Sequence, residues 1–141
     1  MVRPYRGGKV KNIKNLIFDV LDDNIKPTAI CIHASTNDIG SGRNVEDIVG
    51  DLENLIKLVT EGGMMPILSL PTVRTDKFSQ KINVLNSHLV QLCKRNGIHF
   101  IEHRDIKSEH LNQGGLHIIS KFNYLLNANF AKCFNYLLDQ Q

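Results

Sequence analysis

The feature that most constrains the fold is an alternation between two hydrophobic periods along the chain. Short apolar runs that predict strands occur at residues 28–34, 64–70 and 98–102, and the first is of the kind expected of a strand covered on both faces. Segments with apolar residues at helical spacing precede, separate and follow these runs. The helical segments begin near Val10, Asn44, Phe78 and Ser120. Strands that alternate with helices in this way predict a parallel sheet between two helical layers, a three-layer α/β/α domain.

Capping residues indicate where the predicted helices begin and end. Asn44 stands three residues before Asp47, an arrangement that predicts the start of a long helix ended by Gly62 and Gly63. Gly97 ends the next helix, and Ser120 is in position to cap the last one. No repeat or linker interrupts the 141 residues, so we expect one domain that spans residues 1–141.

Composition narrows the class of protein. The chain is 42% hydrophobic and 22% charged, which is typical of a globular domain. No apolar run approaches the roughly 18 residues of a membrane span, and the first residues lack the core of a signal peptide. We therefore expect a cytoplasmic protein without membrane contact. Cys31, Cys93 and Cys133 are odd in number and far apart, which predicts buried free thiols rather than disulfides.

The charged residues leave nucleic-acid binding open as a less favoured alternative. The formal net charge is +3, and basic residues cluster mildly near the start of the chain, at Arg3, Arg6, Lys9, Lys11 and Lys14. Such a cluster can contact phosphates, as in a nucleic-acid-associated module of a mobile element. Aromatic residues make up only 6% of the chain and tryptophan is absent, so a solvated basic face is the favoured interpretation.

The six histidines raise the question of a metal site. His99, His103 and His110 are the closest group, but no pair of them has the spacing of a zinc ligand set with supporting acids. We expect neither a metal nor a cofactor. His33, at the end of a predicted strand, and His88, inside a predicted helix, are interpreted as structural or exposed residues.

Polar residues gather after each predicted strand, where ligands of such sheets bind. These segments are "STND" at 35–38, "PTVRTD" at 71–76 and "HRDIKSEHLNQGGLH" at 103–117. Asn37 can offer N–H donors to a developing oxyanion, and Asp38 can fix the loop by accepting backbone N–H groups. Taken alone, the pair is more typical of a simple Asx-turn than of a ligand site.

Four segments together carry a resemblance to a known family. In order, they are "IHASTNDI", "ILSLPTVR", "INVLNSHLVQLCKRNGIHFIE" and "HLNQGGLHIISK". They resemble the SGNH, or GDSL-type, esterase and lipase superfamily, and in particular the esterase-like domains of some retrotransposon open reading frames. The resemblance spans the chain from Gly7 to about Lys132 and implies a flavodoxin-like parallel sheet. In that family the chemistry is carried by a Ser in Gly-Asp-Ser, a Gly, an Asn in Gly-x-Asn-Asp, and an Asp-x-x-His pair.

Two of these blocks imply an oxyanion hole. "STND" places Asn37 at the family's oxyanion-hole Asn, with Asp38 as support for the loop and Ser35 where the family has Gly. "YRGGKVKNI" resembles the block that contains the Gly. Gly8, or alternatively Gly7, would then give the backbone N–H that shares the oxyanion hole with Asn37.

The catalytic blocks are incomplete. "GGLH" places His117 at the general-base position, but Gly114 stands where the family has the Asp, and Asp105 or Glu109 would have to substitute for it. The sequence contains no Gly-Asp-Ser, so the resemblance implies that the nucleophile and the first strand that carries it are missing. Replacement nucleophiles are not favoured. Ser35, Ser69 and Cys31 are better interpreted as turn or core residues.

We therefore expect a catalytically inactive SGNH-type domain with a site for a small acyl-ester ligand. Without the first strand, the strand at 28–34 would have an unpaired edge, open to self-association or to a strand from a partner. Residues 2–5, "VRPY", are interpreted as a relic of a neighbouring strand. The alternative from the enzyme class is an active carboxylic-ester hydrolase whose nucleophile lies before this chain start.

Overall fold

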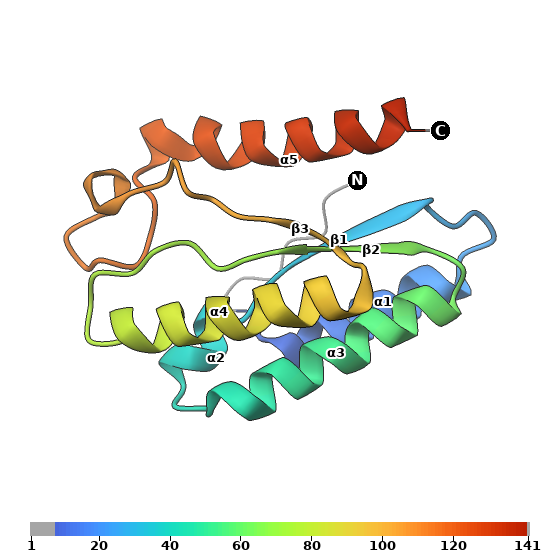
Figure 1. Cartoon of the computed structure of the whole chain (residues 1–141), viewed down its shortest axis with the longest axis horizontal. Helices are drawn as coiled ribbons and strands as arrows, with labels where there is room; N and C mark the ends of the chain where they lie inside the picture. Colours follow the sequence, from blue (N-terminus) through green and yellow to red (C-terminus); the bar gives the residue numbers. More distant parts are fainter. Residues whose placement is uncertain (1–7, 141) are drawn as a thin grey trace.

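The architecture is a three-stranded parallel sheet with helices on both faces (Figure 1). The computed structural model describes residues 8–140. The sheet order is β1-β2-β3, formed by β1 (Ala29–His33), β2 (Met65–Ser69) and β3 (His99–Ile101). The helices are α1 (Val10–Asp22), α2 (Thr36–Gly40), α3 (Val45–Glu61), α4 (Ser79–Asn96) and α5 (Asn123–Asp139). Two short 3₁₀ turns, Ser108–His110 and Ser120–Phe122, lie between β3 and α5.

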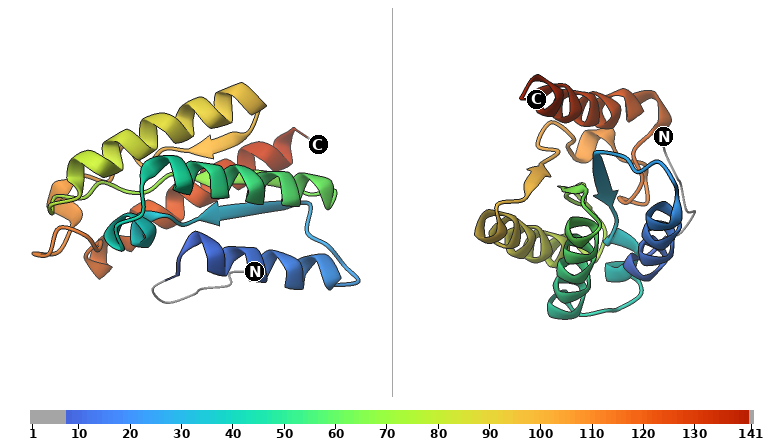
Figure 2. Two further views of the ribbon diagram at one scale, coloured as in Figure 1. Left: turned by 90° about the horizontal axis from the view of Figure 1, so that it is seen from below. Right: turned by 90° about the vertical axis from the view of Figure 1, so that its right-hand side faces the viewer.

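The two faces of the sheet are covered unequally. Helices α1, α3 and α4 lie on one face, and α5 alone lies on the other, as both views in Figure 2 show. The larger core is on the three-helix side and includes Leu52 and Leu89, both fully buried. The smaller core, under α5, is built around Ile67, Ile101 and Leu137. Most of the buried apolar surface, and therefore most of the hydrophobic stabilisation, lies on the three-helix side.

Several predicted helix ends are confirmed in detail. The Asn44 side chain accepts a 2.9 Å hydrogen bond from the Asp47 N–H and so caps α3. Gly97 ends α4 in the left-handed conformation, with φ at 65°. At the start of α1, the Asn12 side chain accepts a 2.9 Å bond from the Lys9 N–H. The predicted order of strands and helices, and the α/β/α layering, are confirmed.

Two local predictions were wrong. The stretch after β1 was expected to be a loop, but residues 36–40 form the short helix α2. Ser120 was expected to cap the last helix, but it opens a 3₁₀ turn and α5 begins at Asn123. The Phe122 N–H donates to the Ile119 carbonyl at 2.8 Å, three residues back, so the chain takes the tighter spacing before the α-helix starts.

Within residues 8–140, β1 pairs with β2 alone. It was predicted to be covered on both faces, but Ala29, Ile30 and Cys31 are only partly buried, since no described strand lies along the outer edge. Residues 2–5, Arg3, Arg6 and Gly7, on which other predictions depended, lie outside the described residues.

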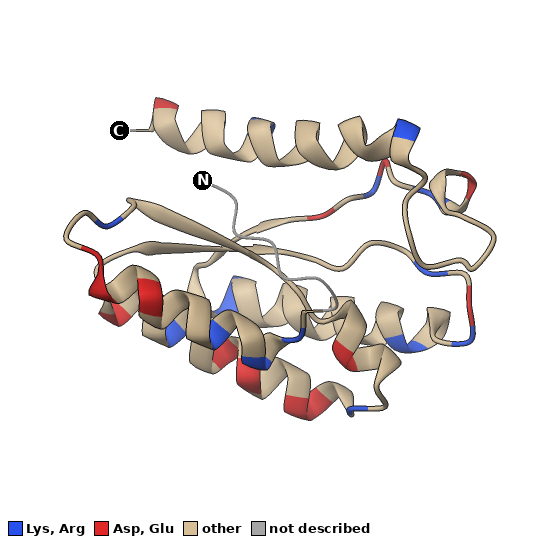
Figure 3. Ribbon diagram, turned by 180° about the vertical axis from the view of Figure 1, so that it is seen from behind, with Lys and Arg blue, Asp and Glu red and all other residues tan. Residues whose placement is uncertain are grey.

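The thiols and the charges follow the two layers. All three cysteines are free thiols, as predicted, but only Cys93 is buried, whereas Cys31 on β1 and Cys133 on α5 are partly buried in the smaller core. Charged residues are frequent on α1 and α3, whereas within α4 they are only Lys81, Lys94 and Arg95 and within α5 only Lys132 and Asp139 (Figure 3). Among the described residues, no helix combines the length and the apolarity needed to cross a membrane.

Candidate functional site

Asn37 and Asp38 hold the chain segment that leads into α1. The Asn37 Nδ2 donates to the Gly8 carbonyl at 2.9 Å, so the two residues implied to share an oxyanion hole are in direct contact. The Asp38 carboxylate is 1% exposed and accepts a 3.0 Å bond from the Val10 N–H, the first N–H of α1. A carboxylate at this position also satisfies the positive end of the helix dipole. Both side chains therefore fix the position of Gly8 and of the start of α1.

Arg43 is the cationic partner of the buried Asp38 carboxylate. Its Nη1 donates to Asp38 at 3.1 Å, and its Nη2 donates to Asp51 at 2.7 Å. These bonds raise the pKa of Arg43, chiefly through Asp51 and then through Asp38. The buried carboxylate is thus paired with a cation as well as hydrogen-bonded to the backbone, which is what burial of a charge requires.

Ser35, two residues before Asn37, is held in an unusual conformation. Its φ is 91°, the only positive φ of a residue other than glycine among those described. The side chain is 1% exposed, and its Oγ has no hydrogen-bond partner in the described part of the chain. A left-handed residue with a buried, unpartnered hydroxyl fits a position that favours glycine. Ser35 is therefore a turn residue at the start of α2, as predicted, and its hydroxyl is enclosed.

Arg74, which was not singled out from the sequence, ties the loop after β2 to the loop after β1. It is 5% exposed and donates from Nη1 to the Thr36 carbonyl at 2.9 Å. It also pairs with Asp76 through two bonds, of 3.0 and 2.5 Å, and its guanidinium stacks over the Phe78 ring at 4.9 Å. The hydrogen bonds from Arg74 lower the pKa of Asp76. The Arg-x-Asp spacing in "PTVRTD" was the available signal for this fork-like pair.

The loop that carries His117 is seated against the same β2 loop. The Thr75 N–H donates to the Gly115 carbonyl at 2.9 Å, and Gly115 has φ of 69°. A Cβ at Gly115 would overlap Thr75 Oγ1 and lie 3.0 Å from the Asp76 N, so only glycine fits this approach. The loops that carry Asn37 and His117 are thus joined through Arg74 and Thr75.

His117 itself is exposed, and its imidazole has no hydrogen-bond partner among residues 8–140. Gly114, at the position of the family's Asp, has no side chain to orient it. The two suggested substitutes do not pair with it: Asp105 accepts from Asn129 at 2.8 Å, and Glu109 lies 3.7 Å from His110. That part of the sequence interpretation was wrong, because each acid is directed to a different partner.

A second polar cluster, which the sequence did not predict, crosses the carboxyl edge of the sheet. Ser69 Oγ lies 2.8 Å from His33 Nδ1 and 2.7 Å from His103 Nε2. His103 Nδ1 lies 3.0 Å from Asn129 Nδ2, which also donates to Asp105. His33 and Ser69 are register partners on neighbouring strands, so their side chains lie on the same face, toward α5. The cluster therefore links all three strand ends to α5.

Burial governs the titration of this cluster. Loss of solvation lowers the pKa of His33 and lowers that of His103 to about 4. The neighbouring His33 lowers the pKa of His103 further, while Asp105 acts in the opposite direction. Ser69 is completely buried and His103 is 7% exposed, whereas the His33 residue keeps an exposed side. Both imidazoles are therefore neutral at neutral pH.

None of the alternative nucleophiles is presented for reaction. Ser69 and Ser35 are both enclosed. Burial, with a smaller effect of Cys133, raises the pKa of Cys31 to about 12, so its thiolate is scarce at neutral pH. These observations agree with the interpretation of all three as turn or core residues.

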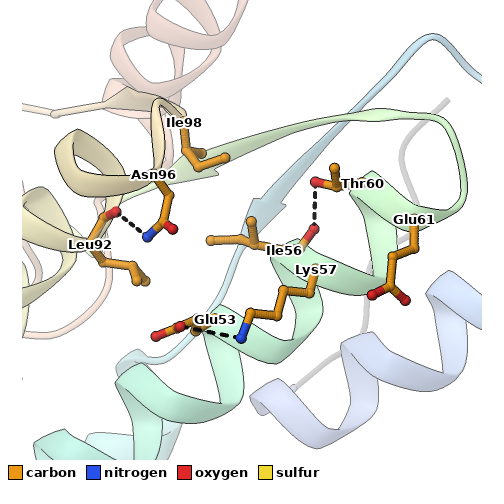
Figure 4. A pocket seen from close by; sticks show the side chains of 8 residues that line it. All are labelled: Glu53, Ile56, Lys57, Thr60, Glu61, Leu92, Asn96 and Ile98. Carbon is orange, nitrogen blue, oxygen red and sulfur yellow. Dashed lines mark hydrogen bonds and ion pairs between the residues drawn. The ribbon is translucent and has the colours of Figure 1, made fainter.

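A hollow of about 280 Å³ lies away from this edge, between α3 and α4 near Ile98 (Figure 4). Its polar groups are occupied locally: Lys57 lies 3.5 Å from Glu53, and the Asn96 amide donates to the Leu92 carbonyl at 2.8 Å. None of the predicted site residues lines it. The hollow is therefore separate from the candidate site.

Comparison with known proteins places the fold. No protein-family model and no curated protein matches the sequence. Solved structures do match. A member of the lipolytic G-D-S-L family from Veillonella parvula has a TM-score of 0.79 and 21% identity, over 92% of this chain and 76% of its own. A carbohydrate esterase family 3 protein from Talaromyces cellulolyticus has a TM-score of 0.81 and 17% identity, over 96% and 70%.

A serine-to-alanine variant of an acetyl esterase, solved with an acetate ion, gives a TM-score of 0.82 at 16% identity, over 95% of this chain and 70% of its own. Identities this low speak for the fold and not for the activity. The parallel α/β sheet, its helical layers and these neighbours together show that the chain has the fold of the SGNH, or GDSL-type, hydrolases.

Proposed function

We propose that this chain is an SGNH-type, esterase-like domain that no longer hydrolyses esters in this form and that binds a small acyl or carboxylate ligand. The ligand site is the carboxyl edge of the sheet, where Gly8, Asn37 and His117 stand on loops that Arg74 and Thr75 join. The observation that carries the proposal is the 2.9 Å contact between the Asn37 amide and Gly8. In it one N–H of the Asn37 amide donates to the Gly8 carbonyl, which places the amide beside Gly8 and leaves its second N–H for a ligand oxygen.

The absence of turnover is argued from the nucleophile and the base. Ser35 and Ser69 are enclosed, and Cys31 has a pKa of about 12, so none of them can replace a Gly-Asp-Ser serine. His117 has Gly114 in place of an orienting acid, which costs on the order of 10⁴-fold in a serine protease that loses its Asp. Origin from a mobile-element esterase-like domain, and a reducing intracellular location for the three free thiols, are part of the same proposal.

Hydrolysis of 4-nitrophenyl acetate tests the catalytic half of the proposal. We expect the parent chain, His117→Ala and Asn37→Ala to show the same rate as buffer. A parent rate well above buffer that both substitutions abolish would overturn the proposal and favour an active hydrolase.

Acetate titration tests the binding half. We expect sodium acetate to shift the backbone amide signals of Gly8 and Asn37 in a saturable way, and Asn37→Ala to remove this response. Asn127→Ala, an exposed Asn on α5, is the matched control and should respond like the parent. If the Gly8 and Asn37 signals do not move with acetate, this half is wrong.

The outer edge of β1 supports a second candidate, in which a strand from a partner or a second copy pairs with β1. Within the described chain β1 bonds only to β2, and Ala29, Ile30 and Cys31 are partly exposed. We expect the β1 amides to gain protection from hydrogen exchange as protein concentration rises and sedimentation shows association. Unchanged exchange in a chain that stays monomeric would exclude self-pairing.

A further inference from the structure

In the hydrogen-bond chain at the carboxyl edge of the sheet, the donor and the acceptor of every bond can be assigned, beginning from the Asp105 carboxylate. The Asn129 side-chain nitrogen donates to the Asp105 carboxylate at 2.8 Å. A carboxylate only accepts, so the Asn129 amide must present its nitrogen, and not its oxygen, to this side. The same nitrogen lies 3.0 Å from His103 Nδ1. Since an amide nitrogen only donates, His103 Nδ1 is an acceptor.

The next two bonds follow from the first. A neutral imidazole whose Nδ1 accepts carries its proton on Nε2, so His103 Nε2 donates to Ser69 Oγ at 2.7 Å. The Ser69 hydroxyl has one proton, and it can give it to His33 Nδ1 at 2.8 Å. The opposite arrangement would leave the Ser69 O–H without an acceptor in a completely buried position, which is costly. His33 therefore accepts at Nδ1 and holds its own proton on Nε2.

Packing fixes the rings as well as the protons. His33, His103 and Phe130 stand edge to face with one another, with ring centroids 5.7 to 5.9 Å apart. His33 ends β1, in the strand that leads directly into the loop of Asn37. Its residue is exposed on one side, and its Nε2 has no hydrogen-bond partner among the described residues. The chain of bonds thus ends in an N–H donor at the edge of the sheet.

We propose that Asn129, His103 and Ser69 form a one-way relay that holds His33 as an Nε2–H donor for an oxygen of a small carboxylate or ester ligand. Asn129 and Ser69 are positioning residues, and His33 is the residue that contacts the ligand. The choice of ligand rests on the proposed function, whereas the direction of the relay rests only on the contacts above. A fixed neutral tautomer presents the donor without any reorganisation on binding.

Histidine tautomers can be read directly from a long-range ¹H–¹⁵N correlation spectrum of the ¹⁵N-labelled chain at pH 7, with ring signals assigned by His33→Gln and His103→Gln. We expect both rings to carry the proton on Nε2. A spectrum in which His33 carries it on Nδ1 overturns the relay.

Two substitutions test the direction. Ser69→Ala cuts the relay between the rings, so we expect His33 to become a mixture of tautomers while His103 stays as it is. Asn129→Leu removes the donor at the start, so we expect both rings to change. Asn127→Leu, on the exposed side of the same helix, should change neither. If His33 is unchanged in Ser69→Ala, the relay is wrong, and this variant keeps the test decisive even if Asn129→Leu does not fold.

The ligand is tested with sodium acetate as the probe. In the parent, acetate should shift the His33 Nε2–H signal in a saturable way. In Ser69→Ala the affinity for acetate should be about two- to threefold weaker, because only part of the His33 population then carries the Nε2–H donor. If acetate does not shift the His33 signal, the ligand assignment is wrong. The direction of the relay is tested independently by the tautomer spectra. Failure of the proposed function is read separately, at the Gly8 and Asn37 amides.

Discussion

The Asp38 carboxylate accepts a 3.0 Å hydrogen bond from the Val10 N–H, 28 positions earlier in the chain, and so caps a helix to which it does not belong. Asp38 stands on α2, while Val10 opens α1. One buried side chain therefore sets the position of α1 against the end of β1. The candidate site depends on this relationship, because Gly8 stands two residues before the first residue of α1.

Asp38→Ala should lower the free energy of unfolding by about 3 kcal/mol. The change leaves the Val10 N–H without its acceptor and takes one of two acidic partners from Arg43. Urea unfolding measures the loss. Asp19→Ala, which removes an exposed carboxylate from α1, is the control and should stay within about 0.5 kcal/mol of the parent. Equal effects of the two changes would show that the cap contributes nothing specific.

Ser35→Gly should stabilise the chain by about 0.5–1 kcal/mol, because glycine adopts a φ of 91° without the steric cost of a Cβ. Ser35→Ala separates the two causes, since it removes the unpartnered hydroxyl and keeps the Cβ. Thermal unfolding of the three proteins gives the order. If the alanine variant matches the glycine variant, the hydroxyl and not the backbone is responsible.

Gly115→Ala should destabilise the chain by about 3 kcal/mol, because a Cβ there meets the backbone of the β2 loop and φ is positive. Gly42→Ala is matched for the positive φ, at 87°, but a Cβ at Gly42 has nothing within 4 Å. We expect Gly42→Ala to cost about 1 kcal/mol in chemical denaturation. Similar losses for both would contradict the close seating of the His117 loop.

Stability should fall as pH decreases from about 6.5 toward 4. Both His33 and His103 have a lowered pKa in the folded chain. Between pH 6.5 and 4 the unfolded chain therefore binds more protons than the folded chain, and protonation favours unfolding. The groups that face His103 are His33 on β1, Ser69 on β2, Asp105 beyond β3, and Asn129 and Phe130 on α5. The loss should be on the order of 3 kcal/mol and is measured by urea unfolding at pH 7.5 and 4.5. His103→Gln should flatten this dependence, and an equally steep dependence in that variant would assign it to other groups.

The sequence predicted the order and type of the long elements because each carries a period that runs for several turns or residues. Residues 36–40 were predicted as a loop, since five residues are too few to establish a helical period and Thr36, Asn37 and Asp38 are equally typical of turns. The start of the last helix was displaced by two residues, from a cap at Ser120 to a cap at Phe122, because a serine can open a 3₁₀ turn as readily as it caps an α-helix.

Only the residues of the candidate site that belong to a local sequence motif could be predicted. Asn37 and Asp38 belong to one local sequence motif, which is why they could be predicted together. Their hydrogen bonds to Gly8 and to the Val10 N–H bring the start of α1 to this motif. The cluster of His33, Ser69 and His103 could not be predicted, since it depends on the register that sets His33 beside Ser69. No single segment of sequence contains more than one of these three side chains.

Because the two faces of the sheet are covered unequally, the face under α5 should be the less stable one. Of the residues of α5 only Leu137 is buried, and the helix is held further by Asn129, whereas the opposite face is closed by three helices. On heating, α5 should lift from the sheet as a separate unit before the rest melts. Cys31 and Cys133 would then become open to thiol reagents while Cys93 stays protected, so the three cysteines are natural reporters of partial unfolding.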